Sequence, residues 1–470
     1  MSLIDALIAS VGASNVLTGD EALPYLTDWR KHTTGRAVAI VRPGNVEQTA
    51  AVVKLCAQAR IAIVPQGGNT GQAAGATPDR TGHAVVINMQ RLNRIREVDT
   101  ENDTITIEAG CILQAVQQAA LQAGRLFPLS LGAQGSCFIG GNLATNAGGT
   151  QVLRYGNARE LTLGLEVVTP QGDIWHGLRG LRKDNTGYDL RDLYIGSEGT
   201  LGIITAATLK LFPLPRAQRT ALLALASLEA ATSVLNRARS GFGAALIAFE
   251  VMSADCLELV TSVFPEQRLP FAGEQALPAW YALLELSDSE SEAHAQERLE
   301  SVLSQALEAG EVHDVAVAAS ESQSTAFWHL RETITLALAA AGTCIKHDIS
   351  LPVSQLAGFV RDTDAVLQHA YPGLRMMVFG HLGDGNLHYN MLGPRAAGKE
   401  EIRAMEKAIQ TLVHDRVHAS GGSISAEQGI GQRRVDDLRR YKSPLELELM
   451  MRIKQALDPL GIMNPGKVLA

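Results

Sequence analysis

The chain has 470 residues, of which 46% are hydrophobic and 19% charged, and its net charge is -8. This length favours two domains over one, and the composition excludes bulk disorder. The negative charge argues against a nucleic-acid partner, because phosphate contacts need a basic face.

The cysteines and the apolar runs indicate where the protein works. Five cysteines without CxxC spacing predict reduced thiols in a cytoplasmic protein. No basic region precedes the short apolar stretch at the N-terminus, so we expect no signal peptide. The longest apolar runs, such as Ile334–Ile345, are too short to span a bilayer, so we expect no integral membrane segment.

A β-α-β unit is predicted near the N-terminus. The apolar run Ala37–Val41 is a strand that Pro43 ends, and Asn45 is a typical N-cap for a helix over Val46–Ala59. A second strand, Ile61–Val64, completes the unit, for which we expect a right-handed crossover.

Three glycine-rich segments follow, at Pro65–Gly71, Gly132–Gly149 and Gly196–Gly202. Successive glycines let backbone N–H groups converge on an anion. Each segment taken singly is typical of a tight turn, but the three together favour a phosphate-bearing cofactor. Neither the GxGxxG fingerprint nor the P-loop is present, so these residues alone leave the cofactor unnamed.

A domain boundary is predicted at Pro213-Leu214-Pro215. Beyond it, apolar runs alternate with helical stretches, which predicts an α+β domain with an antiparallel sheet. The apolar runs are Leu222–Leu225, Ala245–Val251, Trp280–Leu286 and Val312–Ala318, and the helical stretches are Leu228–Arg239, Ser289–Leu307, Ser324–Ala340 and Glu400–Ala419.

The segment from Val378 to Met391 predicts a β-hairpin with Asp384-Gly385 as its two-residue turn. In that register His381 directly faces His388, with Cβ atoms roughly 4.5–5.5 Å apart. Such a pair is either half-buried and satisfied by neighbours or shares one metal ion, and the facing register favours the metal. A metal would need a third ligand, for which Glu427 is the candidate, although by itself such a glutamate is usually a solvated residue at a helix end.

Four segments carry a family resemblance: PQGGNTG, GAQGSCFIGGNLATNAGG, RKDNTGYDL and IGSEGTLGII. They resemble the FAD-binding domain of the vanillyl-alcohol-oxidase type, in the branch of the D-2-hydroxyglutarate dehydrogenases and cytochrome-linked D-lactate dehydrogenases. The resemblance implies an α+β fold, with an FAD-binding domain and an α+β substrate (cap) domain that contains an antiparallel sheet. The domains would be residues 1–215, residues 216–425, and a C-terminal segment, 426–470, that returns to the flavin.

The same resemblance implies which residues bind FAD. No histidine lies between Pro65 and Ala76, so we expect non-covalent binding. The implied cofactor residues are Pro65, Gln66, Gly67, Gly68, Asn69, Thr70, Gly71, Gly135, Ser136, Gly140, Gly141, Asn142, Thr145, Asn146, Gly148, Gly149, Glu198, Gly199, Gly202, Ile203 and Asn464.

Family membership also implies a metal site and a substrate site. His381, His388 and Glu427 match the ligands of a divalent metal, for which Zn²⁺ is the expected ion. By themselves Arg331 and Lys346 are typical of a solvated surface, and Arg331 and Thr335 share a face of the predicted helix. The resemblance makes Arg331, Thr335, Lys346 and Asn390 substrate-binding residues, and the presence of Thr335 and Lys346 favours a dicarboxylic hydroxy acid over lactate.

One position departs from the family pattern. Gln428 replaces the histidine that normally follows the glutamate and takes the hydroxyl proton, and an amide is no base at neutral pH. Either water or another group accepts the proton once the metal has acidified the hydroxyl, or the preferred substrate differs.

The resemblance therefore implies an FAD-dependent D-2-hydroxy-acid dehydrogenase, preferably for D-2-hydroxyglutarate. Reduced flavin would pass its electrons to an acceptor such as electron-transfer flavoprotein or a quinone. The alternatives are a dehydrogenase of D-lactate, D-malate or a larger acid, and a flavin-binding subunit without turnover. A homodimer is left open.

Overall fold

The structure is a computed structural model that describes residues 1–271, 278–394 and 398–469. The chain forms two compact units. The first unit comprises Met1–Gly149, Gly156–Leu214 and Glu427–Ala470, and the second comprises Thr150–Tyr155 and Pro215–Ala426.

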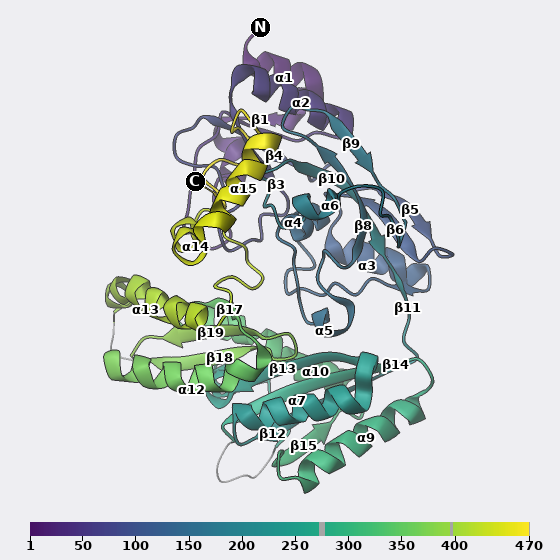
Figure 1. Cartoon of the computed structure of the whole chain (residues 1–470), viewed down its shortest axis with the longest axis vertical. Coiled ribbons are helices and arrows are strands. Elements are labelled where there is room, and N and C mark those ends of the chain that lie inside the picture. Colours follow the sequence, from purple (N-terminus) through teal and green to yellow (C-terminus); the bar gives the residue numbers. More distant parts are fainter. Residues whose placement is uncertain (272–277, 395–397, 470) are drawn as a thin grey trace. The chain divides into compact units, whose positions relative to one another are not determined.

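The first unit opens on a four-stranded sheet in the order β1-β2-β4-β3 (Figure 1). The predicted helix is confirmed as α2 (Val46–Ala59), and the Asn45 side chain caps it by accepting the Gln48 N–H at 2.8 Å. The strands on either side of α2 both run parallel to β4, which lies between them. The strands are β1 (Val16–Leu17), β2 (Ala39–Val41), β4 (Ala84–Asn88) and β3 (Ala62–Gln66).

A second, antiparallel sheet of five strands completes the core of the first unit, in the order β5-β6-β10-β8-β9. Its central strands are almost wholly buried. The strands are β5 (Ile95–Asp99), β6 (Thr104–Glu108), β10 (Ile203–Lys210), β8 (Thr162–Val168) and β9 (Ile174–Gly177), and a two-stranded sheet pairs β11 (Phe212–Pro213) with β7 (Arg125–Leu126). The α-helices of this unit are α1 (Leu3–Val11), α2, α3 (Leu113–Gln122), α4 (Ile139–Ala144), α6 (Arg191–Tyr194), α14 (Val435–Tyr441) and α15 (Pro444–Leu457).

The second unit is built on an eight-stranded sheet in the order β15-β12-β14-β13-β18-β19-β16, with β17 also paired to β19. All these pairings are antiparallel, as the sequence predicts. The strands are β15 (Asp314–Val317), β12 (Ala217–Leu225), β14 (Trp280–Asp288), β13 (Leu246–Ser253), β18 (Arg375–His381), β19 (Asn386–Leu392), β16 (Cys344–Ile345) and β17 (Asp348–Ser350).

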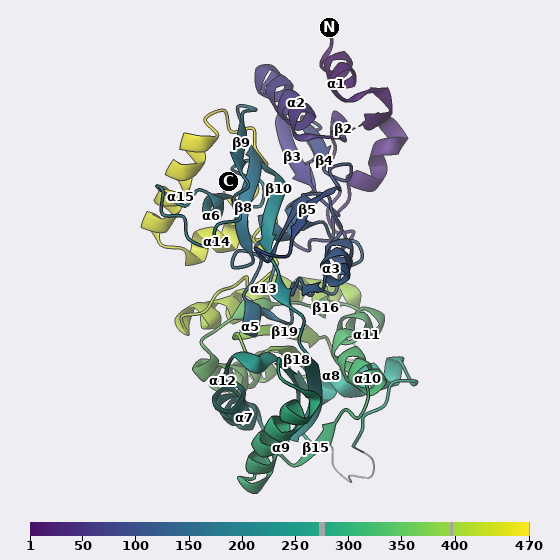
Figure 2. The ribbon, with the colours of Figure 1, turned by 90° about the vertical axis from the view of Figure 1, so that its right-hand side faces the viewer.

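Helices cover both faces of this sheet (Figure 2). One face packs against α8, α10 and α11, whose apolar side chains share a core with Met252, Leu283 and Phe379 of the strands. The helices α7, α9 and α12 lie on the other face. The helices of this unit are α5 (Val152–Tyr155), α7 (Leu228–Phe242), α8 (Ala254–Val263), α9 (Glu292–Glu308), α10 (Glu321–Glu332), α11 (Ile334–Ala341), α12 (Val353–Ala370) and α13 (Lys399–Ala419).

The predicted register of the hairpin is wrong by two residues. His381 faces Asn386, and His388 faces Phe379, because the turn has four residues (382–385) instead of two. Leu382 at the start of this turn is fully buried, and a Cβ at Gly385 would lie 2.3 Å from the Leu351 carbonyl oxygen. Packing of the turn against the rest of the unit therefore overrides the local preference of Asp-Gly.

The predicted continuous helix over residues 324–340 is also wrong, because it is interrupted at Thr333. That residue ends α10 and begins α11, so Arg331 and Thr335 lie on different helices. The Thr333 hydroxyl donates to the His329 carbonyl oxygen at 2.6 Å, a bond with which threonine side chains commonly bend helices.

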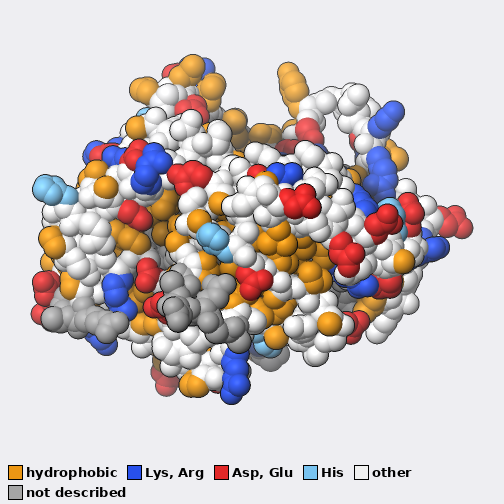
Figure 3. All heavy atoms as spheres, turned by 90° about the horizontal axis from the view of Figure 1, so that it is seen from below, with side chains coloured by type: hydrophobic (Ala, Val, Ile, Leu, Met, Phe, Trp, Pro, Cys, Tyr) orange, Lys and Arg blue, Asp and Glu red, His pale blue; other side chains and the backbone are white. Residues whose placement is uncertain are grey.

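The surface mixes charges of both signs. On the face drawn in Figure 3, Lys and Arg side chains are scattered among Asp and Glu side chains and form no continuous basic surface. Among the helices of the described residues, none combines the length and apolar character needed to cross a bilayer.

Candidate active site

A pocket lies in the first unit, where β3 ends. Residues from all three glycine-rich segments line it, so segments far apart in the chain meet at one place. Of the cofactor residues implied by the sequence, the pocket is lined by Pro65, Gln66, Gly67, Gly68, Asn69, Thr70, Gly71, Gly140, Gly141, Asn142, Thr145, Glu198, Gly199, Gly202 and Ile203.

The remaining implied cofactor residues lie outside the lining of this pocket: Gly135, Ser136, Asn146, Gly148, Gly149 and Asn464. Asn464 is nearly fully buried, and its side-chain amide donates to the carbonyl oxygens of Gly75 and Glu198 at 2.9 and 2.8 Å. It therefore links the C-terminal segment to two stretches of chain that line the pocket.

The pocket has features that fit a phosphorylated cofactor. Asn142 in the lining is buried, and its Oδ1 atom has no hydrogen-bond partner among the described residues. A Cβ added at Gly71 or Gly141 would meet nothing within 4 Å, so the backbone there is open to close approach by a ligand.

The loop after β3 is held by buried amide side chains. The Gln66 amide donates to the carbonyl oxygens of Tyr25 and Ala76 at 2.9 and 3.0 Å. The Asn88 amide donates to the Gln66 Oε1 atom at 3.1 Å and to the Gly67 carbonyl oxygen at 3.2 Å. These bonds satisfy the Gln66 side chain, so it shapes the loop.

Glu198 anchors the turn that follows Gln428. Its carboxylate accepts the N–H groups of Ile430 and Gly431, both at 2.7 Å. Burial raises the pKa of Glu198, against the opposing effect of these two hydrogen bonds. The same turn brings Gln428 to the lining of the pocket, where the sequence alone had not placed it.

Sequence reasoning missed the apolar part of the lining. Met89, Ala109, Phe138 and Ile204 contribute to the pocket wall. Met89 and Ala109 directly follow β4 and β6, Phe138 lies within the second glycine-rich segment, and Ile204 follows the third, so their nearness to these segments is the signal that could have found them.

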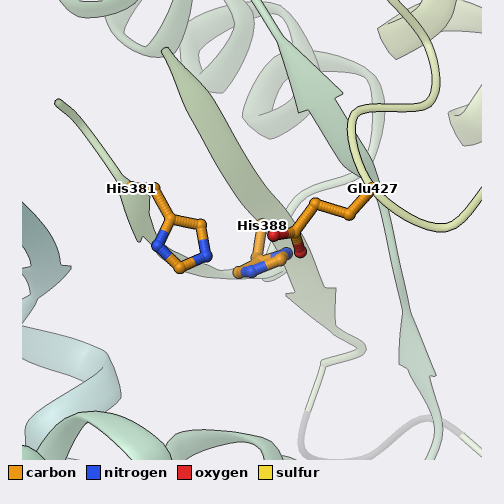
Figure 4. A group of neighbouring side chains, drawn as sticks. All are labelled: His381, His388 and Glu427. Carbon is orange, nitrogen blue, oxygen red and sulfur yellow. The ribbon is translucent and has the colours of Figure 1, made fainter. Parts of the chain in front are cut away.

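The three candidate metal ligands come together. One ligand atom from each of His381, His388 and Glu427 lies within 4.8 Å of the others (Figure 4). The imidazole centroids are 5.6 Å apart although the two histidines are not directly opposed. A two-residue error in register leaves both on the same face of the sheet, because side chains alternate with period two.

Glu427 follows directly on a segment that is hydrogen-bonded to the sheet. The N–H of Ala426 donates to the Asp348 carbonyl oxygen at 3.2 Å, and Asp348 lies opposite His388. One oxygen of the Glu427 carboxylate accepts the Gly149 N–H at 3.1 Å.

The environment of the histidines suits metal binding. Burial lowers the pKa of His388, as do the nearby charges of His381 and Arg331, so the imidazole is neutral and has a lone pair to donate. Two imidazoles and a carboxylate form a donor set that fits Zn²⁺ and leaves coordination positions open.

A buried carboxylate that the sequence analysis missed lies beside His381. Glu250 on β13 is 1% exposed, and its oxygens lie 2.6 Å from His381 Nδ1 and 2.8 Å from Arg331 Nε. Burial raises its pKa, but the charges and hydrogen bonds of His381 and Arg331 outweigh burial and lower the pKa to about 2. Its signal in the sequence is a lone charge within the apolar run Ala245–Val251.

The candidate substrate residues are placed on several elements. Arg331 is buried near the end of α10, with its guanidinium 4.7 Å from the centre of the Phe379 ring. Asn390 on β19 is buried, and its Oδ1 atom accepts the His347 N–H at 3.1 Å. Thr335 on α11 and Lys346 between β16 and β17 are half-buried. Arg331 is connected to His381 through Glu250.

Comparison with known proteins agrees with this arrangement. Residues 37–177 match the family model of the FAD binding domain, and residues 214–468 match that of the C-terminal domain of FAD linked oxidases. The chain is 38% identical to the mitochondrial D-2-hydroxyglutarate dehydrogenase of Bos taurus, over 99% of its own length and 83% of the relative's. It is 39% identical to the D-2-hydroxyglutarate dehydrogenase of Xanthomonas citri pv. viticola, over 94% and 92%.

The chain belongs to the FAD-linked oxidase family. Its fold is similar to that of more distant proteins: p-cresol methylhydroxylase with bound substrate superposes with a TM-score of 0.77 at 17% identity, over 99% of this chain and 96% of that one. An alkyldihydroxyacetonephosphate synthase superposes with a TM-score of 0.74 at 18% identity, over 98% and 85%. The expected FAD-binding domain and α+β fold are thereby confirmed.

Proposed function

We propose that the protein is an FAD- and metal-dependent dehydrogenase of D-2-hydroxy acids, with D-2-hydroxyglutarate as its preferred substrate. The observation that carries the proposal is the His381, His388 and Glu427 cluster, found in a chain 38% identical to a D-2-hydroxyglutarate dehydrogenase over almost its whole length. Without an intact donor set, the chain could equally be a flavin-binding subunit without turnover.

The flavin is proposed to bind non-covalently in the pocket of the first unit. The loop Pro65–Gly71 and the segment Gly140–Thr145 present open backbone to its phosphates, and the side-chain Oδ1 atom of Asn142 offers an acceptor to an N–H or O–H group of the ligand. Bound FAD would supply the two-electron acceptor for the hydrogen on C2 of the substrate. The electrons then leave to an external acceptor such as electron-transfer flavoprotein or a quinone.

The metal site is proposed to take Zn²⁺ through His381, His388 and Glu427. A bound divalent cation would act as a Lewis acid that lowers the pKa of the substrate hydroxyl. The residues of the chain hold the ligand atoms on one face of the sheet, which orients the 2-hydroxy-carboxylate group.

The remote carboxylate of the substrate is proposed to bind Arg331, Thr335 and Lys346, with Asn390 beside His388 on β19. Nε of Arg331 donates to Glu250, whereas its two terminal nitrogens make no hydrogen bond within the described part of the chain. Those nitrogens can donate to a carboxylate, which makes charge-assisted bonds.

Gln428 lines the flavin pocket at the position where the family pattern has a histidine. Its amide accepts no proton at neutral pH, so we propose that the hydroxyl proton passes to water. None of the five cysteines, all of which are described, forms a disulfide, and this supports a reducing, cytoplasmic setting.

Anaerobic bleaching of the bound flavin tests the proposal. D-2-hydroxyglutarate should bleach it faster than D-malate, D-lactate or any L-2-hydroxy acid, and protein freed of metal by a chelator should keep its flavin but lose bleaching. Faster bleaching by D-malate or D-lactate would mean that this acid is the preferred substrate. If no D-2-hydroxy acid bleaches the flavin, the protein is no dehydrogenase of this class. Full activity of the metal-free protein would show that the reaction does not need a metal.

A further inference from the structure

One carboxylate of the second unit contacts two candidate functional groups at once. Glu250 lies directly opposite His381 in the pairing of β13 with β18, so the sheet register sets their contact. Its Oε1 atom is 2.6 Å from His381 Nδ1, and its Oε2 atom accepts from Arg331 Nε at 2.8 Å. With 1% of its surface exposed, Glu250 has no access to bulk water.

The chemistry of a carboxylate determines the state of both partners. An ionised carboxylate accepts hydrogen bonds only, so His381 must carry its hydrogen on Nδ1 to make the bond. In the neutral imidazole that metal binding requires, this tautomer leaves the lone pair on Nε2, where a metal can bind. The other oxygen fixes Arg331 through Nε, which leaves the two terminal nitrogens for a ligand.

Phe379 joins the two sides of this arrangement. The Arg331 guanidinium lies 4.7 Å from the centre of its ring, and the ring centroids of Phe379 and His388 are 4.9 Å apart. Phe379 and His388 are also directly opposed in the hairpin. Arg331 is therefore held by the Glu250 carboxylate and by the Phe379 ring. Each of these two groups also contacts a candidate metal ligand: Glu250 contacts His381, and Phe379 contacts His388.

We propose that Glu250 is a positioning residue that couples the metal site to the substrate clamp, holding His381 in its metal-binding tautomer and Arg331 in the orientation that receives the remote carboxylate. The inference rests on the proposed function, since it assigns a role toward that metal and that substrate. Glu250 acts through His381 and Arg331, and it contacts neither the metal nor the substrate.

Glutamine cannot replace the carboxylate, although it has the same shape. Its single carbonyl oxygen can accept from Arg331 or from His381, and its NH2 group must then face the other. Because Arg331 is charged and always a donor, the oxygen should turn to Arg331 and the NH2 group to Nδ1. His381 would then keep its hydrogen on Nε2, which blocks the metal.

The test compares Glu250→Gln with wild type in the flavin-containing protein. We expect Zn²⁺ affinity, measured by calorimetric titration of the chelator-treated protein, to fall roughly 10- to 100-fold. Removing Arg331 as well, in Glu250→Gln/Arg331→Met, frees the amide oxygen for His381, so the double variant should bind Zn²⁺ about tenfold tighter than the single variant. A merely structural role predicts no such recovery, and its absence would overturn the proposal.

Glu285→Gln is the matched control. Glu285 is a buried carboxylate of the same sheet, and its Oε2 atom accepts from Thr220 and Trp328 at 3.1 and 2.7 Å. Both partners are donors to one oxygen, so glutamine can replace it, and Zn²⁺ affinity should equal that of wild type.

The flavin content of Glu250→Gln reports on its folding. If that variant does not fold, Glu250→Asp is the second test, because a shorter side chain reaches only one partner. Either the Zn²⁺ affinity should then fall or the KM for D-2-hydroxyglutarate should rise, and wild-type values of both would contradict the proposal. If wild-type protein itself binds no Zn²⁺, the role of the metal in the proposed function is disproved. If wild-type protein binds Zn²⁺ and Glu250→Gln binds it equally well, only the role of Glu250 is disproved.

Discussion

At the scale of single residues, the candidate site depends on charges that are removed from water. Glu250 and Arg331 are both buried, and each is paired with an opposite charge. A buried charge is stable only with such a partner, so the ion pair has to be formed before any ligand arrives. The site is thus preorganised by residues that the substrate does not need to move.

Lys346 should discriminate between substrates by their remote group. In Lys346→Ala we expect kcat/KM for D-2-hydroxyglutarate to fall roughly 10- to 100-fold, because a charge-assisted bond to the second carboxylate is lost. D-Lactate has no such carboxylate, so its kcat/KM should change little. Steady-state kinetics on both acids measure the difference, with Lys442→Ala, an exposed lysine paired to Glu446 on α15, as control. Equal losses for both acids would contradict a dicarboxylate clamp.

At the scale of elements, the flavin pocket depends on close approach between two loops. The loop after β3 passes so near the stretch before α4 that a Cβ at Gly68 would lie 2.1 Å from the Ser136 carbonyl oxygen. Backbone atoms cannot move aside as a flexible side chain can, so only glycine allows the two segments to meet.

Gly68→Ala should therefore weaken flavin binding. Overpacking of this kind costs about 1–3 kcal/mol, which corresponds to a loss of FAD affinity of about 5- to 150-fold. The visible absorbance of bound flavin relative to protein, followed during titration of flavin-free protein with FAD, measures the loss. In Gly358→Ala the nearest atom to the new methyl group is an Arg361 nitrogen at 3.7 Å within α12, so this control should bind FAD like wild type. Unchanged affinity in Gly68→Ala would mean that the loop holds no flavin.

At the scale of the whole molecule, the chain passes between the two units more than once. Residues 150–155 belong to the second unit although their neighbours on both sides belong to the first. They form α5, where Leu153 packs on Gly383 of the hairpin turn and Arg154 bonds to Ser287 of β14. Each unit thereby includes segments that are far apart in the sequence.

Flavin should stabilise the protein without being covalently attached to it. Acid precipitation should leave all flavin in the supernatant, because no histidine is present in the loop over residues 65–76. Re-adding FAD at about 100 times its Kd should raise the free energy of unfolding by about 2.7 kcal/mol and raise Tm, as measured by thermal unfolding with and without FAD. Flavin that stays with the precipitated protein would show a covalent bond elsewhere in the chain.

Much of the fold was predictable, because local patterns decide local structure. The capping residue Asn45 and the apolar period place α2 at the predicted residues, and each of the four apolar runs beyond Pro215 overlaps a strand of one antiparallel sheet. The predictions failed where tertiary contacts compete with local preference. The hairpin turn lengthens to bury Leu382, and the predicted helix is interrupted at Thr333.

By itself, the sequence determined the residue types at the candidate site and, through the period of the strand, the shared face of His381 and His388. It could not determine that Glu250 lies opposite His381, because pairing between strands 131 residues apart depends on the register of the whole sheet. Only the tertiary structure decides which buried charges meet, since the energy of a buried charge depends on its neighbours in space and not along the chain.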